Sequence, residues 1–266
     1  MRNYIKSKFI ISGLLVLGVM LSADVVTAES TSLETNGTVK VPGNDSSIIV
    51  DPEKPEKPVN PGEVPSTKGD LRIDYVSSVE FGRVKIDAKK RSYKALAHQF
   101  LDDTEPRGSY IQITDQRTVS TGWSIQVKQN SQFTGDTEAT SSELKGAVLS
   151  LDQAWANSLG NSLAPTVTRN TIAIQNFDTA YELATAKPNT GRGVWTIAFG
   201  ASATNNNNQK NTLEPLIDDK GQAVMDSRVN KQAHSNSAIK LDIPEKVTIK
   251  PQKYKTKLTW ILGDMP

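Results

Sequence analysis

Short segments in which apolar and polar residues alternate are the feature that most constrains the fold. A period of two places every second side chain on the same face of a β-strand, whereas a helix needs a period near 3.6. The alternating segments are residues 71–76, 119–127, 147–151, 171–174, 193–199 and 239–243. Clusters of Gly, Pro, Asn and Asp separate them, as in the turn-like sequences at 106–108, 188–193 and 205–208. The pattern predicts an all-β domain, built as an antiparallel two-sheet sandwich.

Residues 141–163 allow two interpretations. The stretch contains the alternating sequence Ala147-Val148-Leu149-Ser150-Leu151, which favours a strand followed by a loop. A partly helical segment is the alternative for the same residues.

The first 28 residues have the composition of a secretory signal peptide. Basic residues stand at Arg2, Lys6 and Lys8, residues 9–21 are largely apolar, and the small residues at 26–28 offer a cleavage site. A membrane anchor is the alternative, but it needs about 20 apolar residues and this run is shorter. We therefore expect a secreted protein whose mature chain starts at residue 29.

Residues 29–68 differ from the rest of the chain in composition. They are rich in Ser, Thr, Asn, Gly, Glu and Pro, and the part from 51 to 65 is dense in proline and in charges of both signs. Such a segment buries too little apolar surface to offset its chain entropy. The composition predicts a disordered, partly polyproline II spacer over residues 29–68, followed by one domain over 69–266.

Charge and cysteine content exclude several functions. Cleavage after residue 28 removes three of the 31 basic and one of the 29 acidic side chains, which leaves 28 of each and a formal net charge of zero. This balance does not favour nucleic acid as a partner. The chain has no cysteine, so disulfides, thiol nucleophiles and thiolate metal sites are excluded. We also find no metal or cofactor signature.

The closing residues form a spaced motif of their own. Tyr254, Leu258-Thr259-Trp260, Leu262 and Pro266 match the distal signature of the WxL domain, and Trp123-Ser124-Ile125 is similar to its proximal motif, with Ile where the family usually has Leu. The segments FGRVKID, ITDQR, GWSIQVKQNSQFT, LKGAVLSLD and GVWTIAFG follow in the family's order. The resemblance covers residues 69–266.

This resemblance implies a surface protein of Gram-positive bacteria that is held non-covalently on the cell wall, with peptidoglycan as ligand. It also implies membrane-anchored WxL-interacting partners and other WxL-domain proteins in a common assembly. The chain contains no Leu-Pro-x-Thr-Gly sorting signal. Non-covalent retention is therefore the expectation.

The Trp-x-Leu spacing has a physical meaning independent of any family. Positions i and i+2 of a strand share a face, so Trp260 and Leu262 form one apolar patch and Trp123 and Ile125 another. Both patches fit the core of a sandwich, where each buried Trp removes about 150–250 Å² from water. The core is the preferred interpretation, and an exposed platform on which the tryptophan rings stack against sugars is the alternative. The spacing leaves both interpretations open.

Candidate catalytic groups are present without a catalytic signature. His98 and His234 lie in no nucleophile or metal motif, and we expect them at the surface or at strand edges. Carboxylates cluster at Asp102, Asp103 and Glu105 and at 218–219, in sequence typical of turns. A glycan hydrolase needs two carboxylates that face each other across a cleft. A non-catalytic wall-binding protein is the first hypothesis. A wall-acting glycan hydrolase, a secreted carbohydrate-binding module and a ligand carrier are the alternatives.

Overall fold

The structure is a computed structural model that describes residues 30–35, 47–87, 91–135 and 142–265, with only the backbone of 30–35. Within these residues the chain forms strands and no helix, so the all-β class is confirmed. No helix in the described part of the chain is long and apolar enough to span a membrane. The predicted signal peptide lies outside the described residues.

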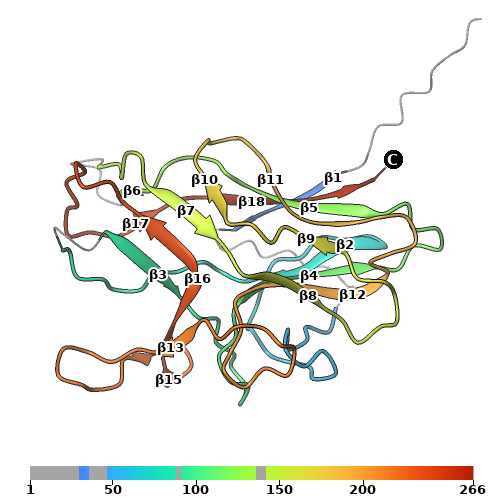
Figure 1. The fold of residues 1–266 in the computed structure, drawn as a ribbon, viewed down its shortest axis with the longest axis horizontal. Helices are drawn as coiled ribbons and strands as arrows, with labels where there is room; N and C mark the ends of the chain where they lie inside the picture. The colour runs from blue at the N-terminus through green and yellow to red at the C-terminus, as the bar shows by residue number, and fades with distance from the viewer. Residues whose placement is uncertain (1–29, 36–46, 88–90, 136–141, 266) are drawn as a thin grey trace, which may run out of the picture.

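Three larger antiparallel sheets hold most of the strands (Figure 1). The first has the order β1 (Ser30–Thr35), β18 (Leu258–Asp264), β5 (Trp123–Gln129), β11 (Tyr181–Ala186) and β9 (Thr166–Val167). The second has the order β10 (Ile172–Ile174), β7 (Val148–Leu151), β16 (His234–Asp242) and β13 (Leu213–Pro215), with β3 (Ser92–Leu96) also paired to β16. The third has the order β2 (Leu71–Val76), β4 (Ser109–Asp115), β12 (Gly193–Phe199) and β8 (Ala154–Asn157).

Two small ribbons complete the set: β14 (Met225–Asp226) with β15 (Lys231–Gln232), and β17 (Tyr254–Lys255) with β6 (Thr134–Gly135). Each predicted alternating segment contains a strand, because its apolar face is buried. The predicted pair of sheets is replaced by three larger sheets. Alternation reveals which face of a strand is buried, but it does not reveal which strands pair.

The ambiguous stretch at 141–163 contains β7 and then β8. The predicted strand is confirmed there, whereas the predicted loop begins only after a second strand. Trp155 of β8 is buried, and its indole Nε1 donates a hydrogen bond to the carbonyl of Gly200 at 2.9 Å. A buried Trp with a satisfied donor holds this segment in the sheet.

The two ends of the described chain meet in the first sheet. Figure 1 shows β1, in blue, running alongside β18, in red. The two strands are antiparallel over their full length, with Leu33 opposite Trp260. β18 pairs on its other side with β5, so the last strand is an interior strand of the sheet. The closing segment is therefore held by ladder hydrogen bonds on both sides.

Residues 47–68 differ from the predicted free spacer. β4 is buried along its whole length, so its sheet is covered on both faces. The main core covers one face, and a smaller cluster around Tyr75, Phe100, Tyr110 and Trp155 lies on the other. Ile49, Val59 and Val64 pack against this smaller cluster. These few apolar residues dock the proline-rich segment, and composition averaged over the whole segment conceals them.

A buried ion pair fastens the same segment. Arg107 donates from Nε and Nη2 to the two carboxylate oxygens of Asp51, each at 2.8 Å, and both side chains are almost completely buried. Glu53 accepts hydrogen bonds from the backbone and the hydroxyl of Ser202, each at 2.6 Å. The side chain of Gln112 bonds to the backbone of Ile48 and Val50. We call residues 47–60 the clasp. The other spacer residues at 29 and 36–46 lie outside the described part.

Candidate functional site

The proximal and distal Trp motifs lie side by side on β5 and β18. In the antiparallel register Leu262 is opposite Ile125 and Trp260 is opposite Val127, so the third positions of the two motifs face each other. Trp123, Ile125 and Leu262 are 0% exposed and Trp260 is 3% exposed. All of them belong to the main core. Their burial favours the core interpretation over an exposed sugar platform.

A glycine shapes the site around Trp123. The indole Nε1 donates to the carbonyl of Gly191 at 3.0 Å. A Cβ on Gly191 would lie 2.9 Å from that nitrogen and 2.6 Å from the Cβ of Ala186, and the residue has a φ of +67°. Only glycine adopts this conformation without strain and leaves room for the ring.

The remaining motif residues divide between the core and the surface. Leu258 is buried in the core, and the Thr259 hydroxyl donates to the Asn130 side-chain oxygen at 2.9 Å. Tyr254 is half-buried, and its hydroxyl accepts from the Lys250 backbone N–H at 2.9 Å. Pro266 lies outside the described residues. The distal motif therefore continues from the core to a surface loop that Tyr254 holds in place.

Arg117, in the segment ITDQR, anchors the end of β18. Its guanidinium donates from Nε and Nη2 to the two oxygens of Asp115, each at 2.9 Å, and from Nη1 to Asp264. The hydrogen bonds that Arg117 donates to Asp115 and Asp264 raise the pKa of its guanidinium. Burial raises the pKa of Asp115, but hydrogen bonds from Arg117 and Ser120 outweigh it and hold the pKa below its usual value. No local pattern in the sequence predicts this role of Arg117.

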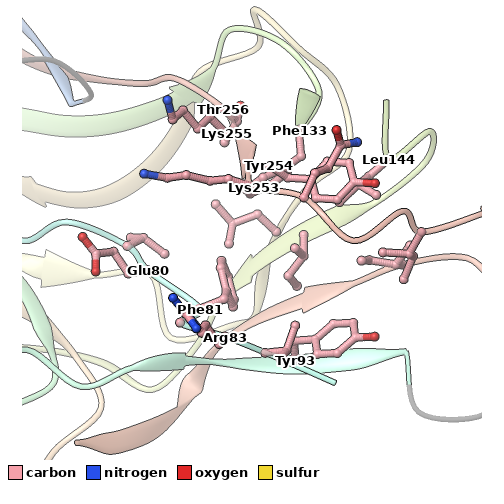
Figure 2. A pocket seen from close by; sticks show the side chains of 18 of the residues that line it. Glu80, Phe81, Arg83, Tyr93, Phe133, Leu144, Lys253, Tyr254, Lys255 and Thr256 are labelled. Carbon is pink, nitrogen blue, oxygen red and sulfur yellow. The ribbon is translucent and has the colours of Figure 1, made fainter. Parts of the chain in front are cut away.

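An apolar groove of about 1010 Å³ opens beside the distal motif (Figure 2). Residues 79–86 form one wall, and residues 249–256 form the other. The floor consists of core side chains: Tyr93, Phe133, Leu144, Leu149, Leu241, Ile243 and Leu258. The Phe81 ring meets the Phe133 ring edge to face, with centroids 6.3 Å apart. This volume is in the range of a ligand site lined by apolar and aromatic side chains.

Positive charges surround this groove. Arg83 stands on one wall, and Lys250, Lys253 and Lys255 stand on the other. Figure 2 shows Lys253 and Tyr254 across the groove from Phe81 and Arg83. Glu80 is the only acidic side chain among the lining residues, and it lies 3.9 Å from the guanidinium of Arg228. The groove therefore suits a ligand that carries both apolar groups and negative charge.

The histidines occupy structural positions. His98 lies against the ring of Phe100, with centroids 4.6 Å apart, and its Nε2 is 3.0 Å from the Tyr75 hydroxyl. Burial, aided by the charge of Arg228, lowers the pKa of His98 to about 3. His98 is therefore packed in an aromatic cluster rather than placed at the surface. His234 lies in β16 and its Nδ1 is 3.1 Å from the carbonyl of Gln232.

The candidate carboxylates serve as acceptors in turns. Asp102 accepts from the backbone N–H groups of Asn60 at 2.5 Å and Thr104 at 2.8 Å. Asp218 accepts from the N–H groups of Lys220 and Gln222, each at 2.8 Å. Across the described ranges, no cluster of three or more His, Asp or Glu side chains is arranged to hold a metal ion. These contacts favour a structural role for both carboxylate clusters.

Comparison with known proteins gives one match. A family model described as WxL domain, surface cell wall-binding, matches residues 28–266. This range includes β1 and the clasp, in agreement with their attachment to the domain. No curated protein and no solved structure matches the chain in the two other comparisons.

Proposed function

Since the chain belongs to the WxL-domain family, we propose that it is a non-catalytic protein held non-covalently on the surface of the Gram-positive cell wall. The family match over residues 28–266 carries this proposal. The mature chain is exported by the signal peptide at 1–28 and is retained by contact with peptidoglycan and by assembly with membrane-anchored WxL-interacting proteins and other WxL-domain proteins. No covalent anchor is needed for such retention.

The core is buried and the groove is open to solvent, and this difference supports a binding role for the groove. The two tryptophan motifs are buried, so they stabilise the domain rather than contact a ligand directly. The groove offers exposed cations above an aromatic and aliphatic floor. Aromatic rings and cations are the groups that bind sugar faces and carboxylates. The groove is therefore the surface that we assign to the contact with the wall or its proteins.

Sedimentation with two wall preparations tests retention. Purified mature protein is mixed with whole walls and with peptidoglycan stripped of protein, and each suspension is pelleted. We expect the protein in the pellet with whole walls. If the protein also pellets with stripped peptidoglycan, it binds peptidoglycan directly. If it pellets with whole walls but not with stripped peptidoglycan, a protein partner retains it. Protein that stays in the supernatant with both preparations contradicts the proposal.

Release from cells tests the non-covalent, non-catalytic part. Hot detergent or strong denaturant is expected to release intact protein without wall digestion. Protein that appears only after muramidase treatment, with wall fragments attached, contradicts non-covalent retention. Incubation of the purified protein with peptidoglycan is expected to release no soluble glycan, and the appearance of reducing ends would identify a hydrolase.

A further inference from the structure

One wall of the groove has backbone groups without partners. Residues 81–86 lie outside every strand, and none of them makes a backbone–backbone hydrogen bond with another described residue. At the start of the wall, the carbonyl of Glu80 accepts from the N–H of Leu96 at 2.6 Å, which ties the segment to β3. A run of N–H and C=O groups without partners among the described residues is a site where another chain can add as a strand. Gly82 has a φ of +64° and Arg83 lies in a bend, so residues 84–86 are the part of the wall that offers such a run.

The side chains of this wall alternate between apolar and basic. Val84 is 48% exposed and Ile86 is 42% exposed. Arg83 directly precedes Val84, and Lys85 stands between Val84 and Ile86. Single exposed aliphatic side chains are ordinary. Two of them on an unpaired segment that borders an apolar groove form a continuous surface, which an added strand would remove from water.

Three cations of the groove lack an acidic partner in the part of the chain that the structure describes. Arg83, Lys250 and Lys253 form no ion pair with any described residue. Lys85 is 3.8 Å from Asp219, but both side chains are almost fully exposed, so water screens this pair. Arg83, Lys250 and Lys253 can therefore bind carboxylates of a ligand that lies between the two walls.

We propose that the groove binds an extended polypeptide segment of a partner protein, in which carboxylate side chains alternate with apolar ones, added as a strand along residues 84–86. The apolar side chains would enter the floor beside Phe81 and Phe133, and the carboxylates would meet Arg83 and Lys253. A glycan or a wholly anionic polymer would use the cations but would leave the apolar floor unfilled. This inference rests on the proposed function, because it names the protein partner through which the chain assembles at the wall.

A labelled peptide tests this inference on the full mature protein. The probe is a fluorescein-labelled synthetic peptide in which Glu alternates with Leu, and binding is measured by fluorescence anisotropy. The double variant R83E/K253E should bind it at least about tenfold more weakly, because attraction becomes repulsion. The matched control is K187E/K210E, which makes the same charge change at two exposed lysines outside the groove. The control should bind within about twofold of the unchanged protein.

Three altered probes separate the possible ligands. A peptide with the same side chains and N-methylated backbone should bind at least about tenfold more weakly, because it cannot donate to the wall. Poly-glutamate should also bind weakly, because it lacks apolar side chains, and a Lys-Leu peptide should not bind. Equal binding of poly-glutamate would assign the groove to anionic polymers, and equal binding of the N-methylated peptide would exclude strand addition. Either result overturns the inference.

The sedimentation experiment distinguishes failure of this inference from failure of the proposed function. If the mature protein pellets with whole walls but does not bind the Glu-Leu peptide, the inference fails and the proposed function stands. If R83E/K253E loses peptide binding and also pelleting with whole walls, the groove is the site of assembly. If the unchanged protein does not pellet at all, the proposed function fails.

Discussion

The two motif strands and the groove wall at 81–86 use similar residues with opposite outcomes. β5 and β18 alternate apolar with polar side chains and are paired on both sides, and Trp123 and Trp260 are almost completely buried. Residues 81–86 also contain aromatic and aliphatic side chains, yet Val84 and Ile86 are exposed and their backbone has no strand partner among the described residues. The buried motif side chains therefore stabilise the fold, and the less regular segment belongs to the surface that we propose for binding.

The largest change in the free energy of unfolding is expected from a substitution in the motif strands. Trp260→Ala should lower the free energy of unfolding by about 3–5 kcal/mol, because it leaves a cavity in the main core. Denaturant titration of the purified variant measures the change, with Trp260→Phe as the control that should lose less. If Trp260→Ala keeps the stability of the unchanged protein but loses wall binding, the Trp260 ring is a ligand contact. That result would contradict a purely structural role for the motif strands.

The clasp should have the next largest effect. Asp51→Asn removes the charge that partners the buried Arg107, and we expect a loss of about 3 kcal/mol in the free energy of unfolding. The exposed neighbour Glu56 provides the control, because Glu56→Gln should change stability by less than about 0.5 kcal/mol. A chain that starts at residue 68 should likewise melt at a lower temperature. Equal melting of the truncated and mature chains would restore the interpretation as a free spacer.

Lowering the pH tests the comparison, because the lowered pKa of His98 links the stability of the fold to pH. The pKa of His98 is about 3 in the folded chain and near 6.5 in an unfolded one. Between these values only the unfolded chain binds the proton, so stability decreases as the pH falls below about 6.5. We expect a loss of about 1–2 kcal/mol between about pH 7 and pH 5.

Denaturant titration at the two pH values measures this loss, and His98→Gln should reduce it. His98 does not line the groove, so binding of the Glu-Leu peptide should change much less over this range. Asp115 and Asp264 act at lower pH, since their lowered pKa values stabilise the folded chain until the pH falls through those values. A pH dependence that survives unchanged in His98→Gln would remove His98 as its cause.

The smallest stability effect is expected on the groove wall. Val84→Thr changes an exposed side chain that makes no core contact, so the free energy of unfolding should change by less than about 0.5 kcal/mol. The same change should weaken binding of the Glu-Leu peptide, because the ligand strand loses an apolar neighbour. Stability and peptide affinity measured on one preparation test both statements. A large loss of stability would place Val84 in the folded core and contradict the difference between the motif strands and the groove wall.

The sequence by itself determined the all-β class and the strands in the alternating segments. For Trp123 and Trp260 it allowed two interpretations, of which burial in the core was one. These conclusions follow from the period of two, which is a local property of the chain. The same local signal could not reveal that residues 47–60 clasp the domain, since Asp51 meets Arg107 only after the chain has folded. It also could not reveal the number of sheets, because pairing depends on contacts distant in sequence.

Tertiary structure alone decided where the groove lies. Phe81, Arg83, Lys253 and Tyr254 come from segments far apart in the sequence. Tyr254 belongs to the distal motif, but the spacing of that motif does not reveal that Tyr254 lies across a groove from Phe81. The segment FGRVKID contains alternating apolar and basic residues, which are visible in the sequence. Only its resemblance to the family distinguishes it from other segments. Whether such a segment is covered by a neighbouring strand or left open is settled by the packing of the whole domain. For that physical reason the core was foreseeable and the candidate binding surface was not.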